Sequence, residues 1–219
     1  MKWKDMFPLL SQKGVVNRFH KLYYNTGPKT WRNTFWFGVP CQKCPLDLWI
    51  YQELVFELKP DRIVECGTAG GGTSFFLAHL CDVAHAGRIL TIDIEEQPNR
   101  PGHPRVTYLC GSDTSDAVVR QVEKFVDGAA RVIVILDSDH SKEHVAQQLS
   151  IYRRFVTPGS YLIVEDSNIG GHPVKPKAGA GPIGAIREFL AKTDEFIVDH
   201  DREKFYLTFN PSGFLKRIR

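Results

Sequence analysis

The sequence lacks the features that mark membrane, secreted and nucleic-acid-binding proteins. No apolar run in its 219 residues approaches the roughly 18 residues that a transmembrane helix needs. The opening segment MKWKDMFPLL has no long apolar core of the kind that a secretion signal carries. The formal net charge is only +3, which favours no nucleic-acid partner. We therefore expect a soluble, cytoplasmic protein with no membrane and no nucleic-acid partner.

Cysteine occurs in an odd number and forms one close pair only. Of the five cysteines, Cys66, Cys81 and Cys110 fall in or beside expected core elements. Buried thiols of this kind indicate a reducing compartment. Cys41 and Cys44 form one CxxC motif, but a structural zinc site normally needs a second such pair, and the sequence has none. The cysteines predict neither a disulfide framework nor a zinc site.

The first 44 residues differ in composition from the rest of the chain. Seven Lys or Arg residues stand against the single acid Asp5 within the first 32 residues. Four aromatic residues follow, which are candidates for the floor of a binding pocket or for a subunit contact: Trp31, Phe35, Trp36 and Phe37. We interpret residues 1–44 as a basic, aromatic and irregular extension, and residues 45–219 as one domain.

From residue 45 onward the chain alternates between helical and strand patterns. Apolar residues at helical spacing predict a helix over 45–60, with Leu46, Leu54 and Leu58 and either Trp49 or Ile50 on one face. Five apolar strands then alternate with helices, at 62–66, 88–93, 105–110, 131–137 and 160–166. The segments 195–200 and 204–210 predict two closing strands joined by a tight polar turn, and hence an antiparallel pair. This order predicts a Rossmann-like α/β fold with a seven-stranded, mostly parallel sheet, a C-terminal antiparallel strand and helices on both faces.

A glycine-rich turn, VECGTAGGGTSFF (64–76), follows the first of these strands. A dinucleotide fingerprint fits only if Ala69 replaces its second glycine. Glu65 would repel a pyrophosphate, whereas it would attract the cationic amino group of a methionine. The pattern acid-x-Gly-x-x-x-Gly, formed by Glu65, Gly67 and Gly71, resembles the S-adenosylmethionine site of class I methyltransferases. Asp93, which closes the second strand, suits a ribose diol under either interpretation.

Acidic residues end the last two parallel strands. Asp137 ends one strand, and Glu165 and Asp166 end the next. Because such strand ends converge in a parallel sheet, the three carboxylates would repel one another unless a cation lay between them. Oxygen ligands suit a hard ion such as Mg²⁺ or Ca²⁺. The competing interpretation is that Asp139 and Asp166 cap helices or turns.

Several stretches together resemble one family, the cephalosporin hydroxylase-like class I O-methyltransferases, which depend on S-adenosylmethionine and a metal and are similar to macrolide-sugar and rhamnosyl O-methyltransferases. The resemblance covers most of the chain from about residue 38, in GVPCQKCPLDLWIYQEL, VECGTAGGGTSFF, LDSDHSKEHV, LIVEDSNIGGHPV, GPIGAIREFL and REKFYLTFNPSGFLKR. It implies a cofactor site containing Glu65, Gly67, Thr68, Gly71, Thr73, Asp93, Gly111, Ser112, Asp113 and Asp137. It also implies metal ligands at Asp137, Glu165 and Asp166, and a general base at His140.

The resemblance leaves some alternatives open. Asp139 lies in the same turn as Asp137 and is an alternative metal ligand. His140 and His144, four residues apart, are an alternative two-histidine metal site. The long Gly- and Pro-rich connection 167–184, with His172, Lys175 and Lys177, is a candidate for closing over the acceptor.

The expected activity is O-methyl transfer to a hydroxyl of a small molecule such as a sugar or a natural-product scaffold, with S-adenosylmethionine and Mg²⁺ or another hard divalent cation as cofactors. The alternative functions are a non-catalytic ligand-binding protein that holds S-adenosylmethionine, and a nicotinamide-dependent oxidoreductase. The small core of a 219-residue chain favours a homo-oligomer. Sugar, polyketide, phenol and β-lactam acceptors are all compatible with the pattern.

Overall fold

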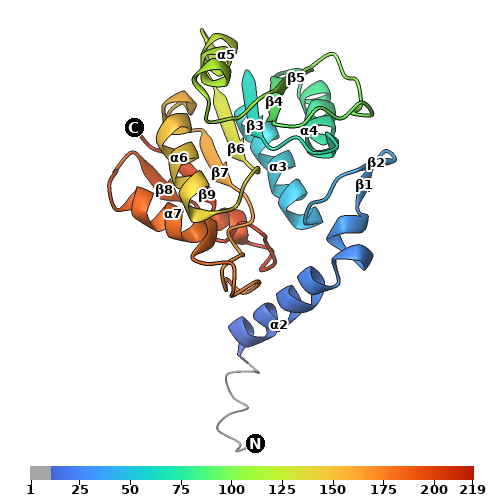
Figure 1. The fold of residues 1–219 in the computed structure, drawn as a ribbon, viewed down its shortest axis with the longest axis vertical. Coiled ribbons are helices and arrows are strands. Elements are labelled where there is room, and N and C mark those ends of the chain that lie inside the picture. The colour runs from blue at the N-terminus through green and yellow to red at the C-terminus, as the bar shows by residue number, and fades with distance from the viewer. Residues whose placement is uncertain (1–10) are drawn as a thin grey trace, which may run out of the picture.

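A seven-stranded sheet forms the centre of the molecule, in a computed structural model that describes residues 11–219 (Figure 1). The strand order is β5-β4-β3-β6-β7-β9-β8, and the first five strands in that order are parallel. β9 runs antiparallel to both of its neighbours. The strands are β3 (Arg62–Cys66), β4 (Arg88–Asp93), β5 (Val106–Cys110), β6 (Val132–Leu136), β7 (Tyr161–Val164), β8 (Phe196–Val198) and β9 (Phe214–Arg217). The predicted fold class is confirmed.

Helices cover both faces of the sheet (Figure 1). They are α3 (Pro45–Leu58), α4 (Gly72–Val83), α5 (Asp116–Val126), α6 (Lys142–Tyr152) and α7 (Gly181–Leu190). Successive strand residues point to opposite faces, so Ile63 packs with α3 and α4, whereas its neighbour Val64 packs with α5, α6 and α7. The sheet is therefore buried on both faces, as its continuous apolar strands require.

Helix α3 begins and ends where the prolines predict. Pro45 occupies its first turn, and Lys59, in the left-handed region at φ 45°, ends it before Pro60. Of the two candidates for its buried face, Ile50 is 1% exposed and Trp49 is 58% exposed. Ile50 is therefore the core residue, and α3 packs on the sheet through Ile50, Tyr51, Leu54 and Val55.

The N-terminal segment is more regular than the sequence analysis predicts. Helix α2 (Gln12–Asn25) is capped by Ser11, whose hydroxyl accepts a hydrogen bond from Gly14 N. A short hairpin of β1 (Phe35–Trp36) and β2 (Val39–Pro40) follows. Residues 1–10, including Asp5, lie outside the described part of the chain. The prediction of an irregular segment is wrong for 12–25, because the cap and the burial of His20 and Tyr24 stabilise a helix.

The second of the two closing strands lies later in the chain than predicted. The partner of β8 is β9, at Phe214–Arg217, and not the segment 204–210. A 3₁₀ helix at His200–Glu203 replaces the predicted tight turn. Leu207 and Phe209 are apolar at strand spacing, but they pack in a small cluster with Tyr24 of α2 and not in the sheet. The antiparallel pairing is confirmed, and the position of its second strand is corrected.

No helix within residues 11–219 has both the length and the apolar character needed to cross a bilayer.

His20 links α2 to the long connection after β7. It is 4% exposed, its ring stacks on Phe209 with centroids 5.6 Å apart, and its Nε2 accepts a hydrogen bond of 2.9 Å from Asn168 Nδ2. Burial lowers the pKa of His20 to about 4. The neutral imidazole therefore belongs to the folded state.

We predict that His20 makes the protein less stable as the pH falls from about 6.5 towards 4. In that window the unfolded chain binds a proton at His20 and the folded chain does not, so acidification favours unfolding, by up to about 3 kcal/mol. Urea denaturation of wild type and His20→Gln at pH 7 and pH 4.5 measures this. The stability of wild type should fall by more than that of the variant.

The exposed His85, whose side chain forms no ion pair within residues 11–219, provides the matched control. His85→Gln should follow the wild-type pH dependence. Parallel curves for wild type and His20→Gln would contradict the prediction.

Candidate active site

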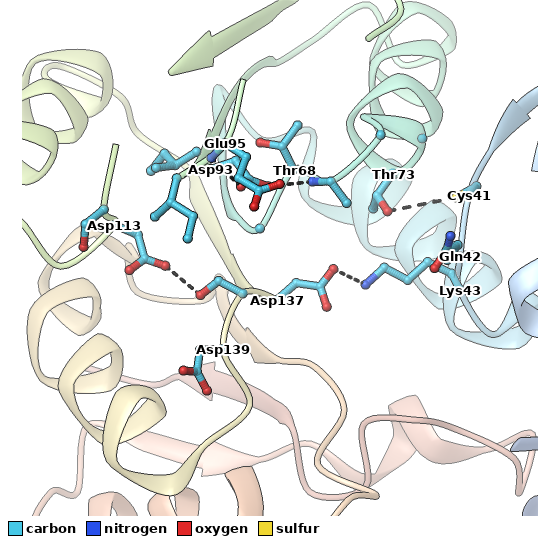
Figure 2. A pocket seen from close by; sticks show the side chains of 18 of the residues that line it. Cys41, Gln42, Lys43, Thr68, Thr73, Asp93, Glu95, Asp113, Asp137 and Asp139 are labelled. Carbon is cyan, nitrogen blue, oxygen red and sulfur yellow. Dashed lines mark hydrogen bonds and ion pairs between the residues drawn. The ribbon is translucent and has the colours of Figure 1, made fainter. Parts of the chain in front are cut away.

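A cavity of about 520 Å³ opens at the carboxyl ends of the parallel strands. The turns after β3, β4, β5 and β6 form three sides of it, and residues 40–43 from the N-terminal segment close the fourth (Figure 2). Eight of the predicted cofactor residues line it, namely Gly67, Thr68, Thr73, Asp93, Gly111, Ser112, Asp113 and Asp137. This is the edge at which open α/β sheets bind ligands.

Two glycines bring the walls of the cavity together. A Cβ on Gly67, at φ 102°, would lie 2.0 Å from the backbone oxygen of Asp137. A Cβ on Gly72 would lie 2.0 Å from the backbone oxygen of Pro40. Gly67 therefore allows the turns after β3 and β6 to touch, and Gly72 allows the N-terminal segment to pack on the start of α4.

Asp93 presents a fixed carboxylate at the end of β4. Its Oδ2 accepts a hydrogen bond from Ala69 N (2.7 Å), and its Oδ1 accepts one from Glu95 N (3.0 Å). Arg100 lies 3.5 Å from Oδ2. A carboxylate has about four acceptor positions, so Asp93 can still accept hydrogen bonds from a ligand diol.

Two of the predicted cofactor residues do not line the cavity. Glu65 is fully buried, and its Oε2 accepts hydrogen bonds from Ser74 (2.5 Å) and Thr91 (2.6 Å). Its Oε1 has no partner among the described residues. Gly71 has φ 78° and faces Tyr108 and Pro101. The structure thus gives Glu65 a role in tying β3 to α4 and β4, and its contact with a cofactor stays a prediction.

Asp113 is the centre of a polar network on the opposite wall. Its Oδ2 accepts a hydrogen bond of 2.7 Å from Ser138 Oγ (Figure 2). Oδ2 also accepts one of 2.7 Å from Gln148 Nε2, and Oδ1 lies 3.2 Å from His144 Nε2. The network joins the turns after β5 and β6 to α6. Sequence reasoning missed Gln148, although a polar residue at a buried position of α6 was the available signal.

The acids at the ends of β6 and β7 do converge, and a lysine lies between two of them. Lys43 Nζ is 2.5 Å from Asp137 Oδ2 (Figure 2). It is also 3.1 Å from Glu165 Oε1. The hydroxyl of Tyr51 also donates to Glu165. Burial opposes the charge of Lys43, but the two carboxylates outweigh it and raise the pKa of Lys43 well above its usual value. Sequence reasoning missed Lys43, which stands in the segment assigned to the extension.

The third acid pairs with the predicted base. His140 Nε2 lies 3.2 Å from Asp166 Oδ2. Asp166 adopts the left-handed region at φ 52°, and its backbone N donates to Asn210 Oδ1 (3.0 Å). Such backbone conformations are sparsely populated and are held in place by their surroundings. The structure therefore brings Asp166 and His140 together beside the other two acids.

The geometry separates the alternatives that the sequence left open. Asp139 accepts a hydrogen bond from Ser141 N (2.7 Å) at the start of α6. It is Asp137, and not Asp139, that shares Lys43 with Glu165. His140 and His144 point to different acids, Asp166 and Asp113, which argues against a two-histidine site.

The chemistry of this cluster fits a hard divalent cation, because its donors are carboxylate oxygens. Within residues 11–219, however, no three His, Cys, Asp or Glu side chains are arranged to hold a metal ion. In this structure the ammonium of Lys43 lies between Asp137 and Glu165 and pairs with both.

A sequence model of the family Rhamnosyl O-methyltransferase/CmcI matches residues 28–218. The chain belongs to this family. It is 35% identical over 214 residues to a rhamnosyl O-methyltransferase of Mycobacterium leprae (strain TN), with 93% of this chain and 90% of the relative covered. It is 37% identical over 213 residues to a rhamnosyl O-methyltransferase of Mycobacterium tuberculosis (strain H37Rv), with 93% and 85% covered.

The solved structures agree on the fold of the family. The structure cmcI-D160 Mg-SAM superposes with a TM-score of 0.65 at 19% identity, covering 86% of this chain and 78% of that one. The chain is therefore a class I S-adenosylmethionine-dependent O-methyltransferase. The predicted family and enzyme class are confirmed, and the family decides against the nicotinamide-dependent oxidoreductase and the non-catalytic ligand-binding protein.

We predict that Gly67→Ala destabilises the protein by about 1 to 3 kcal/mol or more, because the added methyl group collides with the backbone of Asp137 at a positive φ. Urea denaturation without ligand measures this. Gly70→Ala is the matched control, since nothing lies within 4 Å of a Cβ there. Equal stability of the two variants would contradict this account of the turn.

Proposed function

We propose that the protein transfers the methyl group of S-adenosylmethionine to a hydroxyl group of a sugar-containing small molecule, with Mg²⁺ or another hard divalent cation held by Asp137, Glu165 and Asp166. The observation that carries the proposal is the position of Asp137, which lines the cavity and is bridged to Glu165 by Lys43. The acid cluster therefore borders the predicted cofactor space. The names of the mycobacterial relatives support a rhamnose-type acceptor.

The two ends of the cavity suit the two ends of the cofactor. Asp93 would accept hydrogen bonds from the ribose hydroxyls, and Gly111, Ser112 and Asp113 form the wall nearest to the adenine in this assignment. Asp137, on the other side, would face the positively charged methionine end. This orientation directs the methyl group towards the acid cluster.

We infer that His140 acts as the general base. Its Nε2 lies against Asp166, and the two side chains are 26% and 20% exposed, so both remain accessible to an acceptor. When bound, a divalent cation would lower the pKa of an acceptor hydroxyl. His140 would take the hydroxyl proton while the acceptor oxygen forms its bond to the methyl carbon and the bond from that carbon to sulfur breaks.

The connection 167–184 begins directly after Asp166 and is our candidate for the acceptor side of the site. Ile169 and Val174 anchor it in the cluster that contains Tyr24 and Phe209. His172 is half-buried, and Lys175 and Lys177 are exposed. Of the four aromatic residues proposed for the pocket floor, none lines the cavity, and Phe35 and Phe37 are exposed.

A homo-oligomer remains part of the proposal. Val15, Phe19 and Leu22 are exposed on α2 at helical spacing, and large exposed apolar groups of this kind favour a contact. Cytoplasmic location is supported by the five cysteines, all of which are free thiols. The division between an extension, 1–44, and a domain, 45–219, stays a prediction.

We predict that Asp93→Asn weakens binding of S-adenosylmethionine by about tenfold or more, because charged hydrogen bonds contribute roughly 1.5 to 3 kcal/mol. Isothermal titration calorimetry measures the Kd. Glu96→Ala, which changes an exposed acid of the same turn, should bind as wild type does. An unchanged Kd for Asp93→Asn would remove this residue from the cofactor site.

We predict that His140→Gln lowers kcat by about 10²- to 10⁴-fold, the usual contribution of a general base, and leaves cofactor binding intact. The assay follows transfer of labelled methyl groups to synthetic rhamnosides as the pH is varied. The variant should also lose the wild-type dependence of rate on pH.

His85→Gln, at an exposed site, controls for the loss of a histidine. Wild type treated with a chelator should be inactive and should recover when Mg²⁺ is added. Full activity of the chelated enzyme would count against the metal, and full activity of His140→Gln against the base.

A further inference from the structure

Lys43 has a second feature besides its contact with the acids. Of the described residues that line the cavity, it is the one Lys or Arg. Five acids share the lining with it, namely Asp93, Glu95, Asp113, Asp137 and Asp139. The ammonium therefore stands at the boundary between the cavity and the acid cluster, and it can reach groups on either side.

The backbone around Lys43 is held in place, so only the side chain has a choice of partners. Cys41 N donates to Thr34 O (2.9 Å), and Lys43 N donates to Cys41 O (2.7 Å). Pro40 packs against Gly72, and α3 begins directly afterwards at Pro45. The Lys43 side chain is only 7% exposed, so little of it is in contact with solvent. Its ammonium must pair inside the site.

The cofactor brings a group that needs such a partner. The methionine end of S-adenosylmethionine carries a carboxylate, and a cavity lined by five acids repels it. Lys43 lies beside Asp137, at the end of the cavity opposite to Asp113 (Figure 2). In the cofactor orientation proposed above, this end of the cavity holds the methionine part of S-adenosylmethionine.

We propose that Lys43 exchanges partners during binding: its ammonium pairs with Asp137 and Glu165 in the free protein and moves to the carboxylate of the bound cofactor, which frees the acids for the divalent cation. The proposal rests on the function proposed above. It implies that cofactor and metal bind cooperatively. The cofactor draws Lys43 away from the acids that the metal needs, and the metal occupies the acids that would otherwise hold Lys43. By linkage the same factor acts in both directions.

Calorimetry tests this without any turnover. MgCl₂ is titrated into wild type and Lys43→Met with and without saturating S-adenosylhomocysteine, which carries the same carboxylate. In wild type, S-adenosylhomocysteine should tighten Mg²⁺ binding by about tenfold. In Lys43→Met, Mg²⁺ should bind the free protein more tightly than in wild type, S-adenosylhomocysteine should bind more weakly, and the coupling factor should fall to about 1.

Two further variants make the result decisive. Lys124→Met removes an exposed lysine of α5 and should keep the wild-type coupling. Glu165→Gln removes one acid partner of Lys43 outside the cavity lining, so the metal-free variant should bind S-adenosylhomocysteine about threefold more tightly or better. This second test holds even if Lys43→Met folds poorly.

The outcomes separate this proposal from the function on which it rests. Mg²⁺ binding and coupling that are equal in wild type and Lys43→Met would overturn the exchange of Lys43 alone. An affinity for S-adenosylhomocysteine that is unchanged by both Lys43→Met and Glu165→Gln would also overturn the exchange. The carboxylate of the ligand would then be bound by a residue other than Lys43. Absence of Mg²⁺ binding in wild type, with or without S-adenosylhomocysteine, would overturn both the metal in the proposed function and the exchange.

Discussion

The buried ion pairs of Lys43 with Asp137 and Glu165 are the interaction on which the site depends. Three carboxylates at the ends of β6 and β7 would be strongly unfavourable in a buried position without a positive charge. The ammonium supplies this charge at 2.5 and 3.1 Å. A buried pair of this kind adds little net stability, and removing one partner is costly. We interpret the pair as the contact that holds Asp137 and Glu165 close together in the free protein until a ligand replaces it.

The fold provides this arrangement through close backbone contacts. Parallel β3, β6 and β7 end at one edge, which places Asp137 and Glu165 on neighbouring strands. Gly67 lets the turns after β3 and β6 touch. Gly72 lets the N-terminal segment pack against the start of α4, which places Lys43 at this edge of the sheet. On the far side, α2 holds the connection after Asp166 through His20 and Asn168. The N-terminal segment thus contacts the candidate site through Lys43 and the connection after Asp166 through His20.

Much of this could be predicted from residue patterns, for identifiable reasons. The alternation of apolar strands and helices predicted the sheet, and acids at strand ends predicted a charged cluster, because both follow from local spacing. Lys43 could not be assigned to the cluster in this way, since its partner Asp137 is 94 residues away in sequence. The strand predicted at 204–210 failed because Phe209 has strand periodicity but packs on α2. Glu65 matches a motif, and its carboxylate accepts hydrogen bonds from Ser74 and Thr91, so its contact with a cofactor stays a prediction.

The central claim is that a divalent cation and the ammonium of Lys43 occupy the same place in turn. The most direct measurement is a crystal structure of the protein with S-adenosylhomocysteine and Mn²⁺, with anomalous scattering used to locate the metal. Our account predicts one anomalous peak among Asp137, Glu165 and Asp166, with Lys43 Nζ withdrawn from both of its acid partners and paired with the carboxylate of the ligand. A metal bound elsewhere, or Lys43 still seated between Asp137 and Glu165 beside an occupied cofactor site, would contradict it.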